Sequence, residues 1–364
     1  MSKAILALED GRVFEGRAFG AQAERVGEVV FNTSITGYQE IFSDPSYAGQ
    51  IVVLTNPQIG NYGANDDDPQ GAHPFIEGLV VRDFTPRPSN WRSSLSAEDY
   101  LANCGIPIAS EIDTRTLVRH LRSGGVLRGA LSTVPQSAEA LIDKARNAPS
   151  MTGRDLASVV STKTVYDWNE SVPRVSSSEL LEETLEPRHH VVAYDFGVKR
   201  NILRRLRQHG ARVTVVPSVT SAEDALALKP DGVFISNGPG DPEALDAQAA
   251  ELRKLIGKIP IFGICLGQQV VGRALGCTTF KLKFGHRGGN HPVLNKLTNK
   301  VEITAQNHGF CVDPDSLPAS EVELTHFNLN DQTLEGFRHR SEPLFCVQYH
   351  PEAAPGPNDS LYLF

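Results

Sequence analysis

The sequence predicts an α/β protein with two domains: a β-rich, α+β N-terminal domain, and a C-terminal domain whose mostly parallel sheet is flanked by helices. The chain has 364 residues, which is long for a single hydrophobic core. Strand patterns dominate residues 1–150, whereas strand and helix patterns alternate over residues 189–364. Residues 151–188 have the composition of a linker, because their later half is polar, acidic and framed by Pro173 and Pro187.

Short apolar runs bounded by turn residues predict the strands of the first domain. They lie at residues 4–8, 12–16, 27–33, 50–55 and 78–83. Helical spacing first appears at residues 97–103 and 114–123. Two polar, turn-rich stretches, residues 34–47 and 56–63, are ordinary surface loops, a docking face for a partner, or a lip over a neighbouring active site. We therefore predict a β-rich domain whose role is to dock a partner.

Composition and charge exclude several classes of protein. The net charge of −8 argues against a nucleic-acid-binding surface. No apolar run of about 18 residues is present, so no membrane span is expected. Glu9 and Asp10 interrupt the place where a signal peptide needs its apolar core, which predicts a cytoplasmic protein. The 5 cysteines form no C-x-x-C pair, so neither a disulfide framework nor a metal site is predicted.

The second domain has the pattern of a parallel sheet. Predicted strands at residues 191–194, 212–216 and 232–236 alternate with helical stretches, and hairpins follow Gly276. Active sites in such sheets lie beyond the carboxyl ends of the strands. That rule places Asp195, Ser236 and Cys265 on one rim.

The most informative stretch is Gly263-Ile264-Cys265-Leu266-Gly267, which lies between a buried strand and a helix. This G-x-C-x-G pattern is the cysteine counterpart of the nucleophile elbow. The N-terminus of the following helix would favour a thiolate at Cys265. The alternative is that Cys265 is a small buried apolar residue.

A thiolate nucleophile needs a base, and the base needs an orienting group. The last apolar strand, residues 344–349, leads directly into His350-Pro351-Glu352. Glu352 is close enough to His350 to hold the far ring nitrogen and to fix its tautomer. A lone histidine after a strand is more often structural, but its combination with a cysteine elbow favours a catalytic triad.

The tetrahedral intermediate of such a reaction needs two oxyanion donors. We expect one from the Leu266 N–H and the other from Gly238 or Gly240, because Pro239 has no N–H. The same loop does not fit a dinucleotide, since Glu243 stands where the third glycine would be required. Residues 307–310, predicted on a turn, either hold the carboxylate or amine of an amino acid or form a plain β-turn.

Together these motifs resemble those of class I, triad-type glutamine amidotransferases. The motifs concerned are residues 263–269, 236–242, 307–310 and 350–352. Further motifs resemble the family of small, glutamine-hydrolysing subunits of carbamoyl-phosphate synthase, and they lie at residues 31–40, 195–202 and 283–292. The likeness covers nearly the whole chain, although the family often has histidine at the position of Gln268.

The resemblance implies roles for individual residues. Cys265 would attack the side-chain amide of L-glutamine, and His350, oriented by Glu352, would shuttle the proton. The positions that match the family's glutamine-binding residues are Ser46, Gly238, Gly240, Leu266, Gln269, Asn307, Gly309 and Phe310. No cofactor is implied for this chain.

The resemblance also implies a partner, a large synthetase subunit that receives ammonia from this chain. That subunit would use ATP, magnesium and bicarbonate to make carbamoyl phosphate for arginine and pyrimidine biosynthesis. Two alternatives remain open. The chain could be another class I amidotransferase or a γ-glutamyl hydrolase, or it could be a catalytically silent subunit that only binds a partner.

Overall fold

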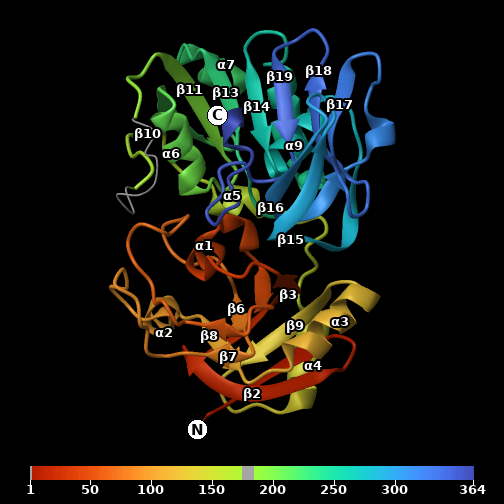
Figure 1. Ribbon diagram of the computed structural model, residues 1–364. Coiled ribbons are helices and arrows are strands. Elements are labelled where there is room, and N and C mark those ends of the chain that lie inside the picture. Colours follow the sequence, from red (N-terminus) through yellow and green to blue (C-terminus); the bar gives the residue numbers. More distant parts are fainter. Residues whose placement is uncertain (1, 174–183) are drawn as a thin grey trace. The chain divides into compact units, whose positions relative to one another are not determined.

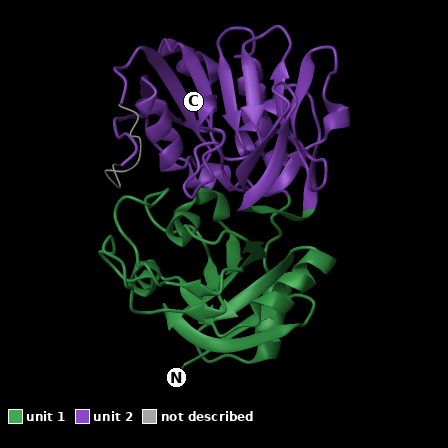
Figure 2. Ribbon diagram, viewed as in Figure 1, with its two compact units in different colours: residues 1–152, 283–288 green, residues 153–282, 289–364 purple. Residues whose placement is uncertain are grey.

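The computed structural model describes residues 2–173 and 184–364, which form two compact units (Figures 1 and 2). Unit 1 runs to Thr152 and also includes Lys283–Gly288. Unit 2 contains Gly153–Leu282 and Gly289–Phe364. The sequence did not predict that a short segment from the second half of the chain would belong to the first unit. No helix in the described ranges is long and apolar enough to cross a membrane.

Unit 1 is built on a closed barrel with the strand order β1-β2-β8-β6-β4-β3-β9. The strands are β1 (Lys3–Leu8), β2 (Val13–Gly20), β3 (Glu24–Asn32), β4 (Gln50–Leu54), β6 (Gly78–Val80), β8 (Pro107–Ser110) and β9 (Leu127–Ser132). Alternate residues of β3 belong to different apolar clusters, with Val29 in one and Val30 in the other. The prediction of a β-rich fold for this part of the chain is confirmed.

Helices and a small pair of strands accompany the barrel. They are α1 (Tyr38–Ser43), η1 (Pro45–Tyr47), β5 (Gln58–Ile59), β7 (Asp83–Phe84), α2 (Ala97–Ala102), α3 (Thr114–Gly124) and α4 (Ala138–Asn147). The α3 helix begins where the Asp113 carboxylate accepts from the Thr116 N–H at 3.0 Å. It ends before Gly125, whose φ of 101° is costly for other residues. These bounds agree with the helix predicted at residues 114–123.

The sheet of unit 2 has the order β10-β12-β11-β13-β14-β19-β18-β17-β15-β16. Its central strands are parallel: β12 (Ala211–Pro217), β11 (His189–Asp195), β13 (Gly232–Ile235), β14 (Ile261–Ile264) and β19 (Leu344–Val347). The remaining strands are β10 (Tyr166–Trp168), β15 (Thr279–Asn295), β16 (Lys300–Val312), β17 (Val322–Asn328) and β18 (Leu334–His339). Antiparallel pairing joins β10 to β12 at one side, and β18 to β19 and β17 at the other.

Helices cover both faces of the parallel strands (Figure 1). The helices and 3-10 turns of this unit are α5 (Ala157–Val160), α6 (Arg200–Gln208), α7 (Ala222–Ala227), η2 (Pro242–Leu245), α8 (Asp246–Arg253), α9 (Leu266–Ala274), η3 (Pro314–Ser316) and η4 (Leu361–Leu363). Val233 and Ile235 of β13 share an apolar cluster with residues of α7, α8 and α9, whereas Phe234 packs in a cluster with residues of α6. This alternation confirms the predicted helix-flanked sheet.

The predicted linker is wrong in one respect, because its described residues carry ordered structure in unit 2. Within residues 151–188, β10 pairs with β12, and Ala157 of α5 is fully buried in the main apolar cluster. The local polar composition did not indicate a strand at β10, because this strand is stabilised by pairing with β12, which is distant in the sequence. Residues 174–183 of the predicted linker lie outside the described residues.

The predicted turn at residues 307–310 is also wrong. These residues lie inside the long strand β16, which neighbours β15 in the sheet. The expectation of a turn depended on Asn307 and Gly309, two residue types that are depleted in strands. Pairing within a sheet overrides such local preferences.

Candidate active site

Cys265 lies at a strained bend between β14 and α9. Its backbone has φ 58° and ψ −109°, which is unusual for a residue with a side chain. A Cβ atom on Gly263 would lie 2.9 Å from the Cys346 sulfur, and one on Gly267 would lie 2.2 Å from the Ile235 carbonyl oxygen. Both flanking residues must therefore be glycine for the turn to form.

The residues of interest follow neighbouring parallel strands at their carboxyl ends. Lys199 follows β11, Gly238 follows β13, Cys265 follows β14, and His350 follows β19. These four strands are adjacent in the sheet, so the chain brings the segments that follow them to one rim.

His350 and Glu352 form a buried pair, with exposed fractions of 3% and 0%. Nδ1 of His350 lies 2.8 Å from Oε1 of Glu352. Nε2 of His350 has no hydrogen-bond partner within the described residues. The Cys265 side chain is nonetheless near enough to raise the pKa of His350. Cys265 and His350 thus have the arrangement of a nucleophile and its base before substrate binds, when the contact between two such groups is often long.

The electrostatics of the site favour a protonated His350 and an ionised Glu352. Burial by itself lowers the pKa of His350, but the charges of Glu352 and Cys265, together with the hydrogen bond to Glu352, outweigh burial and raise that pKa to about 10. Burial by itself raises the pKa of Glu352. The charges of Lys199 and His350 lower that pKa by more than burial raises it, so that it falls to about 2. At neutral pH the site therefore holds an imidazolium at His350, beside the Cys265 sulfur.

Lys199 is a member of this site that the sequence did not reveal. Its buried Nζ atom lies 2.8 Å from Oε1 of Glu352 and donates to the Ala353 carbonyl oxygen at the same distance. Five of the nine residues at 199–207 are basic, a pattern that is typical of a solvated helix face, yet Lys199 and Arg204 are both buried. The family motif at residues 195–202 includes Lys199 and could have pointed to it. The role of Lys199 nevertheless depends on the carboxylate of Glu352, more than 150 residues away in the sequence.

Removing Lys199 should leave a buried carboxylate without its cation. We expect Lys199→Met to lower the free energy of unfolding by about 3–5 kcal/mol at neutral pH, because one partner of a buried ion pair is lost. Urea denaturation measures this change. The double variant Lys199→Met/Glu352→Gln should regain part of the loss, whereas simple additivity of the two single effects would contradict the coupling.

The loop after β13 lies against the elbow. A Cβ atom on Gly238 would lie 2.0 Å from the Phe196 carbonyl oxygen and 3.0 Å from a methyl carbon of Leu266. Leu266 is the first residue of α9, so its N–H has no acceptor within the helix. Gly240 has a φ of 97° and approaches the Arg154 carbonyl oxygen. Gly238 is thus the loop glycine that packs beside Leu266.

This close approach makes Gly238 sensitive to substitution. We expect Gly238→Ala to destabilise the protein by about 1–3 kcal/mol, because the methyl group overpacks a backbone contact. Gly232→Ala is the matched control, since a Cβ there would meet nothing nearer than 3.7 Å. Equal stability of the two variants in urea denaturation would show that the loop does not pack as described.

The structure brings most of the predicted glutamine-binding residues of unit 2 near Cys265. The Cys265 thiol donates to the Asn307 carbonyl oxygen over 3.6 Å. Nε2 of Gln269 donates to the Phe310 carbonyl oxygen at 2.7 Å, and Gly309 lies between Asn307 and Phe310 on β16. Ser46 belongs to unit 1, where its N–H donates to the Asp44 carboxylate at 2.9 Å.

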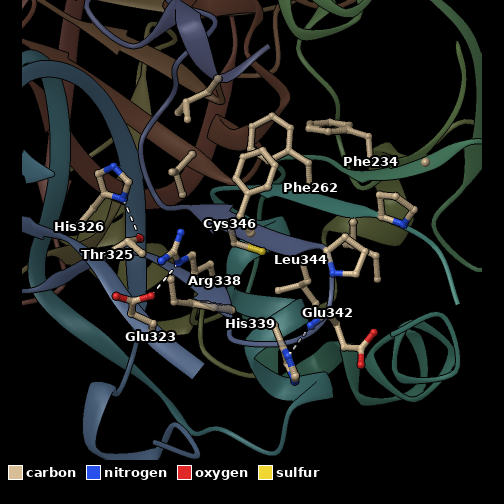
Figure 3. A pocket seen from close by; sticks show the side chains of 18 of the residues that line it. Phe234, Phe262, Glu323, Thr325, His326, Arg338, His339, Glu342, Leu344 and Cys346 are labelled. Carbon is tan, nitrogen blue, oxygen red and sulfur yellow. Dashed lines mark hydrogen bonds and ion pairs between the residues drawn. The ribbon is translucent and has the colours of Figure 1, made fainter. Parts of the chain in front are cut away.

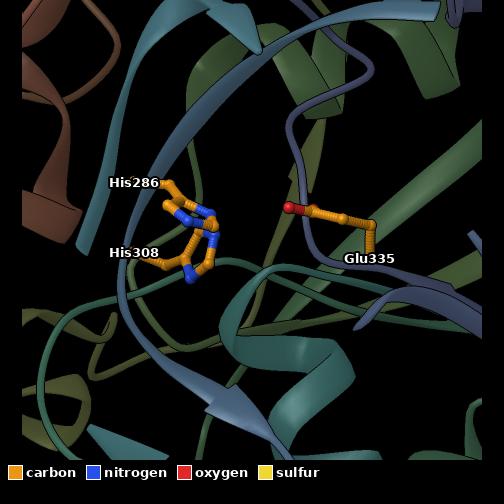
Figure 4. Close-up of side chains that lie close together, drawn as sticks. All are labelled: His286, His308 and Glu335. Carbon is orange, nitrogen blue, oxygen red and sulfur yellow. The ribbon is translucent and has the colours of Figure 1, made fainter. Parts of the chain in front are cut away.

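A buried polar network supports this part of β16. Nε2 of His308 lies 3.0 Å from Oε1 of Gln306, whose Nε2 donates to Glu335 of β18 at 2.9 Å. Figure 4 draws His308 and Glu335, together with His286 of unit 1. Sequence reasoning missed Gln306 and Glu335, because no local pattern marks two side chains that hydrogen-bond to each other from strands distant in the sequence.

The cavity drawn in Figure 3 lies elsewhere in unit 2. Its volume is about 930 Å³, and its lining includes Phe234, Phe262 and Phe345. It reaches the amino-terminal ends of β13 and β14 at Gly232 and Ile261, whereas Cys265 follows the carboxyl end of β14. This cavity contains none of the triad residues, so we do not assign the chemistry to it.

Comparisons with known proteins show which families the chain resembles. Residues 192–364 match the family described as glutamine amidotransferase class-I, and residues 6–131 match the carbamoyl-phosphate synthase small chain, CPSase domain. The chain is 56% identical over 362 residues to a carbamoyl phosphate synthase small chain from Syntrophotalea carbinolica, covering 100% of this chain and 96% of the relative. It is 52% identical over 363 residues to the protein of that name from Akkermansia muciniphila, covering 100% of this chain and 95% of the relative.

Proposed function

The chain belongs to the family of carbamoyl-phosphate synthase small chains, and we propose that it hydrolyses L-glutamine through a thioester on Cys265. The observation that carries this proposal is the buried chain of contacts from Lys199 through Glu352 to His350, beside a cysteine elbow. Its products are L-glutamate and ammonia. A catalytically silent role has no comparable support, since Cys265, His350 and Glu352 all lie in one unit and His350 pairs with Glu352.

In the first half of the reaction, the Cys265 sulfur attacks the amide carbon of the glutamine side chain. The negative charge that develops on the amide oxygen is stabilised by the N–H of Leu266 and the loop at Gly238. His350 then gives its proton to the nitrogen, and the C–N bond breaks to release ammonia. Because Glu352 keeps His350 charged, the proton is available when the leaving group needs it.

In the second half, water hydrolyses the γ-glutamyl thioester. His350, now neutral, takes a proton from the water as the oxygen attacks the thioester carbon. The C–S bond breaks, glutamate leaves, and the proton remains on His350 beside a regenerated thiolate. The sum is glutamine plus water giving glutamate plus ammonia.

The proposal includes a partner, a large synthetase subunit to which the β-rich unit 1 docks. Ammonia would pass through a channel to that subunit, which would combine it with bicarbonate at the expense of ATP, with magnesium. This chain itself would need no cofactor. The product, carbamoyl phosphate, would serve arginine and pyrimidine biosynthesis in the cytoplasm.

Reconstitution with a carbamoyl-phosphate synthase large chain tests the proposal. We expect the mixture to form carbamoyl phosphate from L-glutamine, bicarbonate and ATP, whereas the large chain alone should require added ammonia. Glutamine hydrolysis without transfer of nitrogen to carbamoyl phosphate would instead indicate a γ-glutamyl hydrolase or another amidotransferase. Absence of glutamine hydrolysis in the reconstituted mixture would overturn the proposal.

A further inference from the structure

We propose that Gln348 is a positioning residue that orients the amide of Gln269, so that the site selects substrates with an α-ammonium group. This inference rests on the proposed glutaminase function. Gln269 lies one helical turn beyond Cys265, on the same side of α9. Gln348 directly follows β19 and lies two residues before His350. Both side chains are buried.

The hydrogen bonds fix which way the Gln269 amide faces. Its Nε2 atom donates to the Phe310 carbonyl oxygen at 2.7 Å and to Oε1 of Gln348 at 3.0 Å. A backbone carbonyl oxygen can only accept, so the atom of Gln269 beside it must be the nitrogen. The atom of Gln348 facing that nitrogen must in turn be its oxygen. Both N–H hydrogens of the Gln269 amide are then used within the protein.

This arrangement leaves Gln269 with acceptor capacity alone. Its Oε1 atom makes no hydrogen bond to any described residue, and it is not among the fully enclosed polar atoms. A ligand that contacts this amide must therefore donate a hydrogen bond to it. The α-ammonium group of an amino acid is such a donor, whereas a carboxylate can only accept and would be repelled.

Gln348 is well placed to hold this orientation. Its backbone N–H donates to the Glu335 carbonyl oxygen at 2.8 Å, which fixes the chain just after β19. Its own Nε2 atom has no partner within the described residues. Among the described residues, the contact to Gln269 is thus the one hydrogen bond that the buried side-chain amide of Gln348 makes, and the Nε2 donor stays unpaired. Packing alone would be served by an apolar side chain of the same size.

The test compares L-glutamine with glutaramate, the analogue that lacks the α-amino group. Ammonia release is measured for both, with the full chain in complex with the large chain. We expect Gln348→Met to reduce kcat/KM for L-glutamine about tenfold, mainly through KM, because a charge-assisted hydrogen bond is weakened. The value for glutaramate should be nearly unchanged, so the preference for L-glutamine should fall by the same factor.

Gln268→Met is the matched control. Gln268 is fully buried near the same elbow, and neither polar atom of its side chain has a partner within the described residues. The variant Gln268→Met should keep the parent protein's preference for L-glutamine over glutaramate. Equal losses for both substrates in Gln348→Met, or an unchanged preference, would overturn the inference while leaving the glutaminase function intact. Complete absence of glutamine hydrolysis in the parent complex would instead overturn the proposed function.

Discussion

Replacing Cys265 with serine will abolish carbamoyl-phosphate formation from L-glutamine and leave its formation from ammonia intact. A serine hydroxyl beside an imidazolium is far less ionised than a thiol, so no thioester equivalent forms at a useful rate. We expect a loss of roughly 10⁴-fold or more in kcat, as for removal of the nucleophile in other triads. The measurement is steady-state kinetics of the reconstituted complex with each nitrogen donor.

Two controls make this result specific to the elbow. Cys311→Ser removes another buried thiol of unit 2 but not the nucleophile, and the complex should still use glutamine. The ammonia-dependent rate of Cys265→Ser reports whether the complex still assembles. If Cys265→Ser keeps glutamine-dependent synthesis, the covalent mechanism is wrong.

The second large effect is expected for His350→Asn. Asparagine keeps a polar side chain but cannot give a proton to departing ammonia, so glutamine hydrolysis should fall by about 10³-fold. The pKa of His350 is raised to about 10, and the parent enzyme should therefore keep its proton donor at neutral pH and lose activity as the pH approaches 10. A pH profile of kcat measures this alkaline limb, and a limb near pH 6.5 would contradict the charged resting state.

The same shifts predict how stability depends on pH. His350 has a pKa raised above its unfolded value of 6.5, so its contribution is complete below pH 6.5 and is lost as the pH rises through about 10. The pKa of Glu352 is lowered from 4.5, so its contribution is present above pH 4.5 and is lost as the pH falls through about 2. In His350→Asn the alkaline loss of unfolding free energy should disappear. Urea denaturation of both proteins between pH 6.5 and 10 tests this.

Much of the site could be predicted because its signals are local. The G-x-C-x-G pattern contains the glycines that the bend around Cys265 requires, and His350 and Glu352 are two residues apart. The family resemblance added Gln269 and Phe310, which the structure joins by a hydrogen bond. The alternation of strands and helices was likewise sufficient to predict a helix-flanked sheet.

The rest depends on pairing between distant segments. Lys199 stands in a basic run that by itself is typical of a solvated helix face, and only the fold brings its side chain to Glu352. The strand β10 was hidden in a polar segment, since its apolar partner is β12. Residues 307–310 looked like a turn, although sheet pairing extends β16 through them. Gln348 carried no motif, and its contact with Gln269 emerges only in three dimensions.

The central claim is that Cys265 is a reactive nucleophile held beside His350. The most direct measurement is to treat the full chain with a diazoketone analogue of L-glutamine and to map the modified residue by peptide mass spectrometry. We expect modification of Cys265, prevented by excess L-glutamine, with the exposed Cys104 unmodified under the same conditions. Modification elsewhere that glutamine does not prevent, with Cys265 intact, would contradict the account.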